Sequence, residues 1–103
     1  EIEMTPLLGQ SFFLIGRDLA LCTIQATHPS ISKQHAVIQF RREFIQSELK
    51  SEIIVPYLKD LNSANGTHLN QQSLESGEFY ELHSGDVFKL GTSSREYVFI
   101  KED

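Results

Sequence analysis

The sequence predicts an all-β sandwich, on three observations. Its apolar residues come in short runs, several of which alternate apolar and polar positions with the period of two that a half-buried strand requires. Clusters of polar turn residues separate these runs, as they do in two-sheet folds. The chain has 103 residues, of which 40% are hydrophobic, and that is enough for one buried core but not for two.

Three strands are expected in the first two thirds of the chain. The segment 12–15 is an apolar run that ends at Gly16. The segment 36–40 alternates, so its even-numbered residues share one face. The segment 53–61 contains Pro56, which lacks a backbone N–H and is therefore expected at a sheet edge or a bulge.

The C-terminal part adds two expected strands, 86–90 and 96–100, of which the second is rich in aromatic and β-branched residues. The segment 44–50 is expected to form a loop or the extension of a hairpin. Residues 1–9 are interpreted as a lead-in segment, which places the domain at residues 10–103.

The composition argues against several classes of function. The formal net charge is -5 at pH 7, whereas a nucleic-acid partner usually requires a basic surface. No apolar run approaches the roughly 18 residues of a membrane span. Cys22 is the single cysteine, and the histidines show no metal-ligand spacing, so neither a metal nor another cofactor is expected. We therefore expect a monomer whose partner is a protein.

Two polar motifs directly adjoin expected strands, and a third closes the turn after the segment 53–61. Gly16-Arg17 follows the first strand, the segment 32–35 precedes the second, and Asn65-Gly66 closes a turn. Loops at strand ends converge at the rim of a sandwich, where binding sites are disproportionately built.

Four of these residues carry the chemistry that a phosphate requires. Arg17 offers a planar fork of charged donors that matches phosphate oxygens. Ser32 adds a hydroxyl donor and Lys33 adds a point charge. Asn65 has both amide donors and an acceptor, so it can also hold a peptide backbone. A phosphothreonine carries about −1.5 to −2 charges and three acceptor oxygens, so this set predicts a phosphopeptide site.

The order and spacing of the motifs resemble those of the forkhead-associated (FHA) family over about residues 10–101. The motifs that carry the resemblance are Gly16-Arg17, Ser32-x-x-His35, Asn65-Gly66-Thr67, Asn70 and Leu82-x-x-Gly85-Asp86-x-Phe88-x-Leu90-Gly91. The resemblance implies an FHA-type β-sandwich of about eleven strands with binding loops at one end. It also implies a phosphothreonine-binding module that is not an enzyme.

The same resemblance assigns a role to each matching residue. Arg17 and Ser32 would bind the phosphate with help from Lys33, and Asn65 would fix the backbone of the bound peptide. His35 would not touch the ligand but would brace the binding loops through hydrogen bonds. Gly16 and Gly66 would serve the backbone geometry, and Thr67 and Asn70 would shape and brace the turn.

Two positions depart from the family pattern. Ala64 stands where the family often has serine or threonine, whose hydroxyl also helps to bind phosphate. One contact is therefore missing, and a lower affinity is expected. Asn70-Gln71 replaces the Asn-Gly that is common at the next turn, which is expected to affect only the shape of that loop.

Two segments resemble one branch of the family in particular, namely 28–37 and 93–98. They are similar to the FHA subunit of the nuclear pre-mRNA retention and splicing complex and to the related animal Smad nuclear-interacting protein. This resemblance implies a nuclear location and partners in the splicing complex, including an RNA-recognition-motif subunit. In that branch the segment that docks onto this subunit precedes the FHA domain, so we expect it to lie outside this chain.

Two other functions fit parts of the sequence. Ser32, His35 and Asp60 are the residue types of a small hydrolase, although no nucleophile elbow and no glycine-rich oxyanion loop accompany them. An FHA domain can also serve as a scaffold that binds partners through other surfaces, without phosphate. Ala64 favours this alternative, and the intact phosphate-binding set argues against it.

We predict that the domain binds phosphothreonine peptides at least several-fold more tightly than matched phosphoserine peptides. The extra methyl group of threonine can fill a small apolar pocket, and one buried methyl group is worth on the order of 1 kcal/mol. Calorimetric titration of the two peptides measures the ratio of their dissociation constants, and equal values would contradict the prediction.

Overall fold

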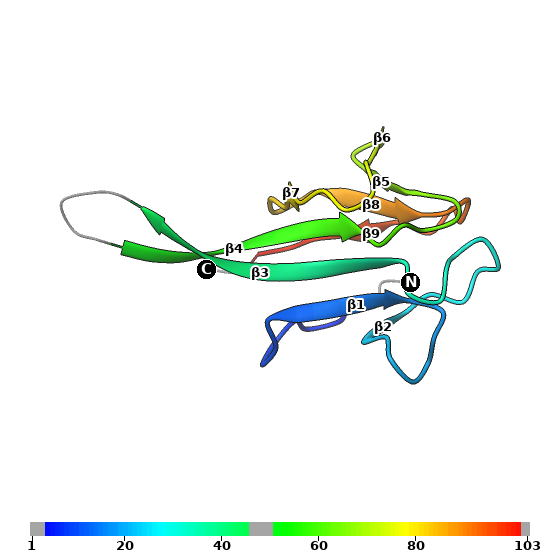
Figure 1. Cartoon of the computed structure of the whole chain (residues 1–103), viewed down its shortest axis with the longest axis horizontal. Helices are drawn as coiled ribbons and strands as arrows, with labels where there is room; N and C mark the ends of the chain where they lie inside the picture. Colours follow the sequence, from blue (N-terminus) through cyan, green and yellow to red (C-terminus); the bar gives the residue numbers. More distant parts are fainter. Residues whose placement is uncertain (1–3, 46–50, 102–103) are drawn as a thin grey trace.

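The chain folds into two β-sheets that pack as a sandwich (Figure 1). The computed structural model describes residues 4–45 and 51–101. One sheet, here called sheet A, contains β1 (Phe12–Gly16), β2 (Ile24–Gln25), β3 (Ala36–Ile45), β4 (Ser51–Asp60) and β7 (Tyr80–Glu81) in the order β2-β1-β3-β4-β7. The other, sheet B, contains β5 (Thr67–Leu69), β6 (Gln72–Ser73), β8 (Val87–Leu90) and β9 (Tyr97–Val98) in the order β6-β5-β8-β9.

Alternating residues of the paired strands form the core. The antiparallel register of β1 and β3 sets Phe13 opposite Ile38 and Ile15 opposite Ala36, and all four side chains are buried. Because side chains directly opposite each other share a face, these four residues cover the inner side of sheet A. The residues of sheet B that join the same core are Leu69, Phe88 and Leu90. The face predicted for the second expected strand is therefore confirmed.

The described residues form nine strands rather than about eleven, because pairing continues beyond some strands through single hydrogen bonds only. Beyond β9, the Phe99 N–H donates to the Asp86 carbonyl (2.8 Å) and the Gly85 N–H donates to the Phe99 carbonyl (2.7 Å). Beyond β7, the Leu82 N–H donates to the Pro56 carbonyl (2.9 Å). The expected C-terminal strand is accordingly shortened to two residues.

β3 and β4 form a long hairpin that projects beyond the rest of the sandwich, at the left of Figure 1. Phe44 and Ile45 belong to β3, so this part of the segment 44–50 forms the hairpin extension that was one of the two expected alternatives. The rest of that segment, residues 46–50, lies outside the described residues. The hairpin points away from the end of the sandwich where the polar motifs lie.

Pro56 lies in β4, an inner strand of sheet A between β3 and β7, and the register of β3 and β4 shows no bulge there, so the expected edge or bulge is not found. Pro56 lies opposite Phe40 in the register of the hairpin, but its carbonyl points away from β3 and accepts the N–H of Leu82. Within the described residues, strand pairing on that side of β4 covers only Tyr57 and Leu58. The missing N–H of the proline therefore removes no hydrogen bond from the ladder.

The lead-in expected at residues 1–9 is described from Met4 onward and forms no strand up to residue 9. Its half-buried Leu7 packs against the core. No helix in the described ranges is long and apolar enough to cross a membrane.

A two-residue turn, Asn70-Gln71, joins β5 to β6, and the φ angles of its residues are 49° and 68°. Two positive φ values define a type I′ turn, whose twist matches that of the strands it joins and whose preferred sequence is Asn-Gly. Asparagine tolerates this region, whereas most residues with a Cβ atom pay roughly 1–2 kcal/mol to enter it. The chain thus keeps the turn that the family favours in spite of the glutamine.

Replacing Gln71→Gly is expected to raise the free energy of unfolding by about 0.5–1 kcal/mol. Glycine enters the left-handed region without a Cβ clash, and its greater freedom in the unfolded chain offsets part of the gain. Urea unfolding followed by circular dichroism measures the change. Gln72→Gly is the matched control, since it lies in β6 and should lower stability; equal effects of the two substitutions would rule out the turn as the cause.

Candidate functional site

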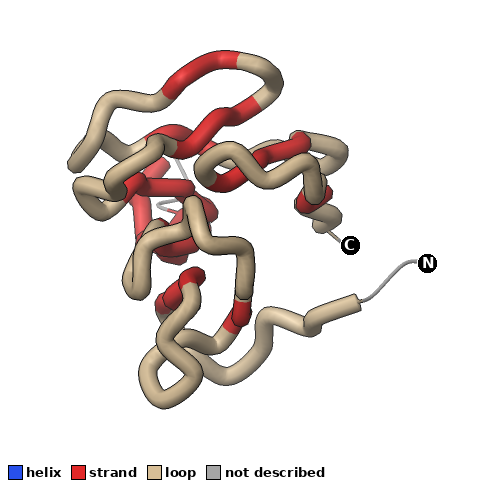
Figure 2. The backbone as a smooth tube through the Cα atoms, turned by 90° about the vertical axis from the view of Figure 1, so that its right-hand side faces the viewer, coloured by secondary structure: helices blue, strands red, loops and turns tan. Residues whose placement is uncertain are grey.

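Four loops meet at the end of the sandwich opposite the projecting hairpin, at the right of Figure 1 and toward the viewer in Figure 2. They are residues 17–23 after β1, residues 26–35 before β3, residues 61–66 between β4 and β5, and residues 91–96 between β8 and β9. Three of these loops carry the predicted phosphate-binding residues Arg17, Ser32, Lys33 and Asn65.

Gly16 allows the first two loops to touch. A Cβ atom at this position would lie 2.1 Å from the carbonyl oxygen of Lys33 and 2.9 Å from that of Ser32, so only glycine fits. The Arg17 N–H then donates to the Ser32 carbonyl (3.2 Å), and the Asp18 N–H donates to the Lys33 carbonyl (3.1 Å). The Gly-Arg motif therefore fixes Arg17 directly beside the loop that carries Ser32.

Arg17 and Ser32 present donors from two loops that are joined to each other. The guanidinium of Arg17 is half-buried, and its Nε–H donates to the carbonyl of Ile31, which holds the side chain while its Nη groups remain as donors. The Ser32 Oγ accepts the N–H of Ala64 (3.0 Å), so the hydroxyl proton of Ser32 can be donated to a ligand.

Ser30 links three loops, a role that sequence reasoning missed. Its carbonyl accepts the Nδ2–H of Asn65 (2.8 Å), and its Oγ accepts the N–H of Thr92 (2.9 Å) and lies 2.7 Å from His28 Nδ1. A Cβ atom at Gly91 would lie 2.6 Å from the Ser30 Oγ, so glycine is also required there. Only the glycine of the later family motif pointed to this contact, because the partners of Ser30 lie far from it in the chain.

His35 braces two of the loops from inside the fold. Its imidazole is completely buried; Nδ1 accepts the N–H of Ser32 (3.0 Å), and Nε2 lies 2.7 Å from the carbonyl of Gly66. Because Nδ1 accepts a hydrogen bond, Nε2 carries the ring proton and donates a hydrogen bond to the Gly66 carbonyl, which fixes the tautomer. This is the bracing contact that the family resemblance implies.

The hydrolase alternative requires a different arrangement of the same residues. Backbone atoms engage both ring nitrogens of His35, so neither is placed to accept the hydroxyl proton of Ser32. The carboxylate of Asp60 accepts hydrogen bonds from Ser63 and Thr67 instead of orienting the imidazole. The histidine and the aspartate therefore both serve the geometry of the loops.

Asp60 holds the turn that carries Asn65. Its buried carboxylate accepts the Ser63 N–H (3.1 Å), the Ser63 hydroxyl (2.6 Å) and the hydroxyl of the completely buried Thr67 (2.7 Å). Burial by itself raises the pKa of Asp60, but the hydrogen bonds from Ser63 and Thr67 outweigh burial and hold the pKa below its ordinary value. An aspartate followed three residues later by serine, at the end of a strand, is the local signal for such a turn.

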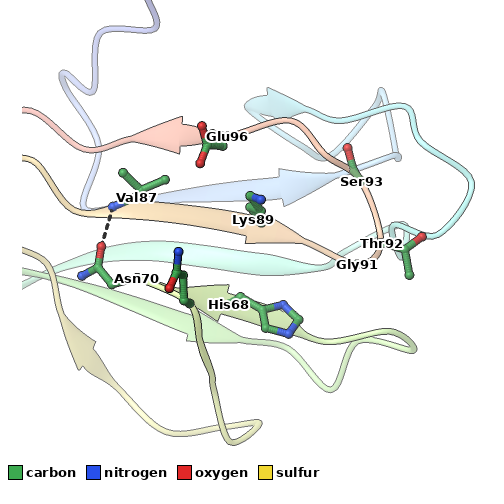
Figure 3. A pocket seen from close by; sticks show the side chains of 9 residues that line it. His68, Asn70, Val87, Lys89, Gly91, Thr92, Ser93 and Glu96 are labelled. Atoms are coloured by element: carbon green, nitrogen blue, oxygen red, sulfur yellow. Dashed lines mark hydrogen bonds between the residues drawn. The ribbon is translucent and has the colours of Figure 1, made fainter.

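Asn70 lies apart from these loops. Its Nδ2–H donates to the Asp86 carboxylate (3.0 Å), and its Oδ1 accepts the N–H of Val87 (3.0 Å; dashed line in Figure 3). It therefore braces the β5–β6 turn against β8, at the end of β8 away from residues 91–96. The structure brings the other predicted site residues together but not this one.

The assembled end of the sandwich can hold an anion that is carried on an extended chain. It offers a charged fork, a hydroxyl and an amide from three loops, together with the exposed Lys33. In the part of the chain that the structure describes, no group of three or more His, Cys, Asp and Glu side chains could hold a metal ion.

The comparisons with known proteins match this geometry. The FHA domain family model matches residues 13–91. Smad nuclear-interacting protein 1 of Mus musculus is 45% identical over 105 residues, which cover 97% of this chain and 27% of that protein. The MEK1 FHA domain in complex with the HOP1 pThr318 peptide has a TM-score of 0.75 and 33% identity, covering 95% of this chain and 87% of that chain.

A second solved structure, of the yeast Pml1 splicing factor described with its integration into the RES complex, has a TM-score of 0.71 and 35% identity. The match covers 89% of this chain and 63% of that chain. The chain spans less than a third of the length of the first curated relatives, 31% of an Arabidopsis thaliana FHA domain-containing protein and 27% of the mouse protein.

Thr67→Val is expected to lower the free energy of unfolding by about 1–3 kcal/mol at pH 6, because a buried carboxylate loses a hydrogen-bond donor. Because the pKa of Asp60 is lower in the folded than in the unfolded chain, the ionised carboxylate stabilises the fold. This stabilisation is fully present above the pKa that Asp60 has in the unfolded chain, and it is lost as the pH falls through the pKa that Asp60 has in the folded chain. The difference between the variant and the parent should therefore narrow toward pH 3. Urea unfolding at several pH values measures it, with Thr23→Val in an exposed loop as the control; a constant difference would contradict the assignment.

Proposed function

Because this chain belongs to the FHA domain family, whose members are phosphopeptide-binding modules, we propose that it binds a phosphothreonine on a partner protein. In this proposal Arg17 and Ser32 bind the phosphate, Lys33 assists, and Asn65 holds the backbone of the bound peptide. The observation that carries the proposal is the buried imidazole of His35, which sets the distance between the Ser32 loop and the turn that carries Asn65.

The expected affinity follows from the number of charged contacts. A phosphothreonine carries about −1.5 to −2 charges at neutral pH, and a hydrogen bond to a charged group is worth roughly 1.5–3 kcal/mol. Two or three such bonds contribute about 3–9 kcal/mol. A micromolar dissociation constant corresponds to about 8 kcal/mol after the cost of association, so contacts to the peptide backbone and its flanks must supply the difference. The net charge of -5 is no obstacle, since Arg17 and Lys33 gather positive charge at one end of the fold.

We further propose that the domain acts in the nucleus, within the pre-mRNA retention and splicing complex. Two relatives support this by name: a Smad nuclear-interacting protein, and the pre-mRNA leakage protein 1 (Pml1) of Saccharomyces cerevisiae, a splicing factor whose structure concerns its integration into the RES complex. Within that complex, the domain would contribute recognition of a phosphorylated protein segment.

Arg17→Ala should abolish measurable binding of a phosphothreonine peptide while leaving the fold intact, since it removes the charged fork from a site whose loops are held by other residues. The experiment titrates a degenerate phosphothreonine peptide library and its unphosphorylated twin against the parent and the variant. Arg42→Ala is the matched control, because Arg42 is exposed on the hairpin and pairs only with Glu52 among the described residues.

Two results would count against the proposal. Binding that Arg17→Ala leaves unchanged would place the peptide elsewhere on the domain. A folded parent that binds neither library would favour the phosphate-independent scaffold instead.

Ala64→Ser should strengthen phosphopeptide binding about two- to tenfold. The Ala64 side chain is exposed and its N–H already contacts the Ser32 Oγ, so an added hydroxyl lies beside the proposed phosphate site. One net hydrogen bond is worth about 0.5–1.5 kcal/mol. Fluorescence polarisation with a labelled peptide measures the change, and the exposed Ala20→Ser serves as control. Unchanged affinity for Ala64→Ser would show that residue 64 does not face the phosphate.

A further inference from the structure

A groove runs along the outer face of sheet B (Figure 3). His68 on β5 and Lys89 on β8 lie directly opposite each other in the antiparallel register, so both side chains point to this outer face. Glu96 lies on the other side of β8, and Thr92 and Ser93 close one end of the groove. The face is polar, in contrast to the inner face of the same strands.

The groove ends at a loop that is hydrogen-bonded to the loops of the proposed phosphate site. The Gly91 N–H donates to the carbonyl of Gly66 (2.8 Å), the same carbonyl that His35 braces. The next residue, Thr92, is held by Ser30, which also holds the side chain of Asn65. The loop that closes the groove is therefore bonded to the loops that would hold the phosphothreonine and its backbone.

Two groups of the groove that can contact an anion, the charged Lys89 and the hydrogen-bonding ring of His68, are available to a ligand. Lys89 is exposed and His68 is half-buried, and neither side chain makes a hydrogen bond or an ion pair to any residue in the described ranges. Glu96 is likewise without such a contact there. An acidic ligand group would therefore be attracted to the β5 side of the groove, near Lys89 and His68, and repelled from the side of Glu96.

Resting on the proposed function, we propose that this groove holds one flank of the bound phosphopeptide and selects a carboxylate side chain, aspartate or glutamate, in that flank. Lys89 would be the specificity-determining residue, supported by His68. His68 lies three residues after Asn65 in the chain and directly opposite Lys89 in the ladder. At about 3.3 Å per residue along a strand and about 4.8 Å between strands, the path from Asn65 to Lys89 is roughly 15 Å, so the carboxylate is expected about four or five residues from the phosphothreonine.

The test compares phosphothreonine peptides that carry glutamate or glutamine at these distances, on either side of the phosphothreonine. At low salt the parent domain should bind the better glutamate peptide roughly two- to fivefold more tightly than its glutamine twin, the range of an exposed ion pair. High salt should reduce this preference. Fluorescence polarisation against the parent and three charge-neutralising variants measures the ratio.

Two of the variants should change the ratio of the glutamate-peptide and glutamine-peptide affinities in opposite directions, and the third should leave it unchanged. Lys89→Gln should remove the preference but leave the affinity for the glutamine peptide unchanged, whereas Glu96→Gln should increase the preference. Lys59→Gln, which removes a lysine from sheet A, should change neither. A preference that survives Lys89→Gln, or no preference on either side, would overturn the assignment of the groove.

Failure of the proposed function would produce a different pattern. In that case neither peptide would bind in a phosphate-dependent manner, or Arg17→Ala would leave both affinities unchanged, and the groove assignment would fall with it. If only the groove assignment is wrong, both peptides still bind, still require Arg17, and have equal affinities in every variant.

Discussion

A single buried imidazole sets the distance between two loops that approach each other from different sheets. His35 accepts a hydrogen bond from the backbone N–H of Ser32 and donates one to the backbone carbonyl of Gly66. Both contacts are therefore to backbone groups, which every residue type other than proline would keep at positions 32 and 66. Without the ring, the Ser32 N–H would lose its hydrogen-bond partner, at a cost of about 1–3 kcal/mol, and the Gly66 carbonyl would keep only the N–H of Gly91. The position of Ser32 relative to Asn65 depends on this constraint.

Contacts between backbones hold the remaining loops. Gly16 and Gly91 are the two positions where a Cβ atom would collide with a neighbouring loop, and each lies where one loop docks on another. Asp60 fixes the turn at residues 61–66, because its ionised carboxylate accepts hydrogen bonds from the neutral hydroxyls of Ser63 and Thr67. A site built in this way is ordered before a ligand arrives, which lowers the entropy that binding must overcome.

The chain modifies the family pattern at two places and keeps the geometry at both. At residue 64 the hydroxyl common in the family is absent, but the backbone N–H still bonds Ser32. At residue 71 a glutamine adopts the left-handed conformation of the usual glycine. The proposed contact of Lys89 with a ligand carboxylate would add affinity where Ala64 has removed a phosphate contact.

The sequence by itself predicted five of the nine described strands, β1, β3, β4, β8 and β9, because the period-two pattern and turn chemistry are local. The strands β2, β5, β6 and β7 have only two or three residues each, too few for such a pattern, and were decided by the tertiary structure. Short, ordered motifs also predicted Arg17, Ser32 and Asn65 as binding residues. Only the tertiary structure decided that Ser30 joins Asn65 and Thr92, which are 35 and 62 residues away, and that Asn70 lies apart from the site. These contacts, and the position of His68 directly opposite Lys89, depend on how distant strands pair and how the two sheets pack. A local sequence pattern contains no information about either.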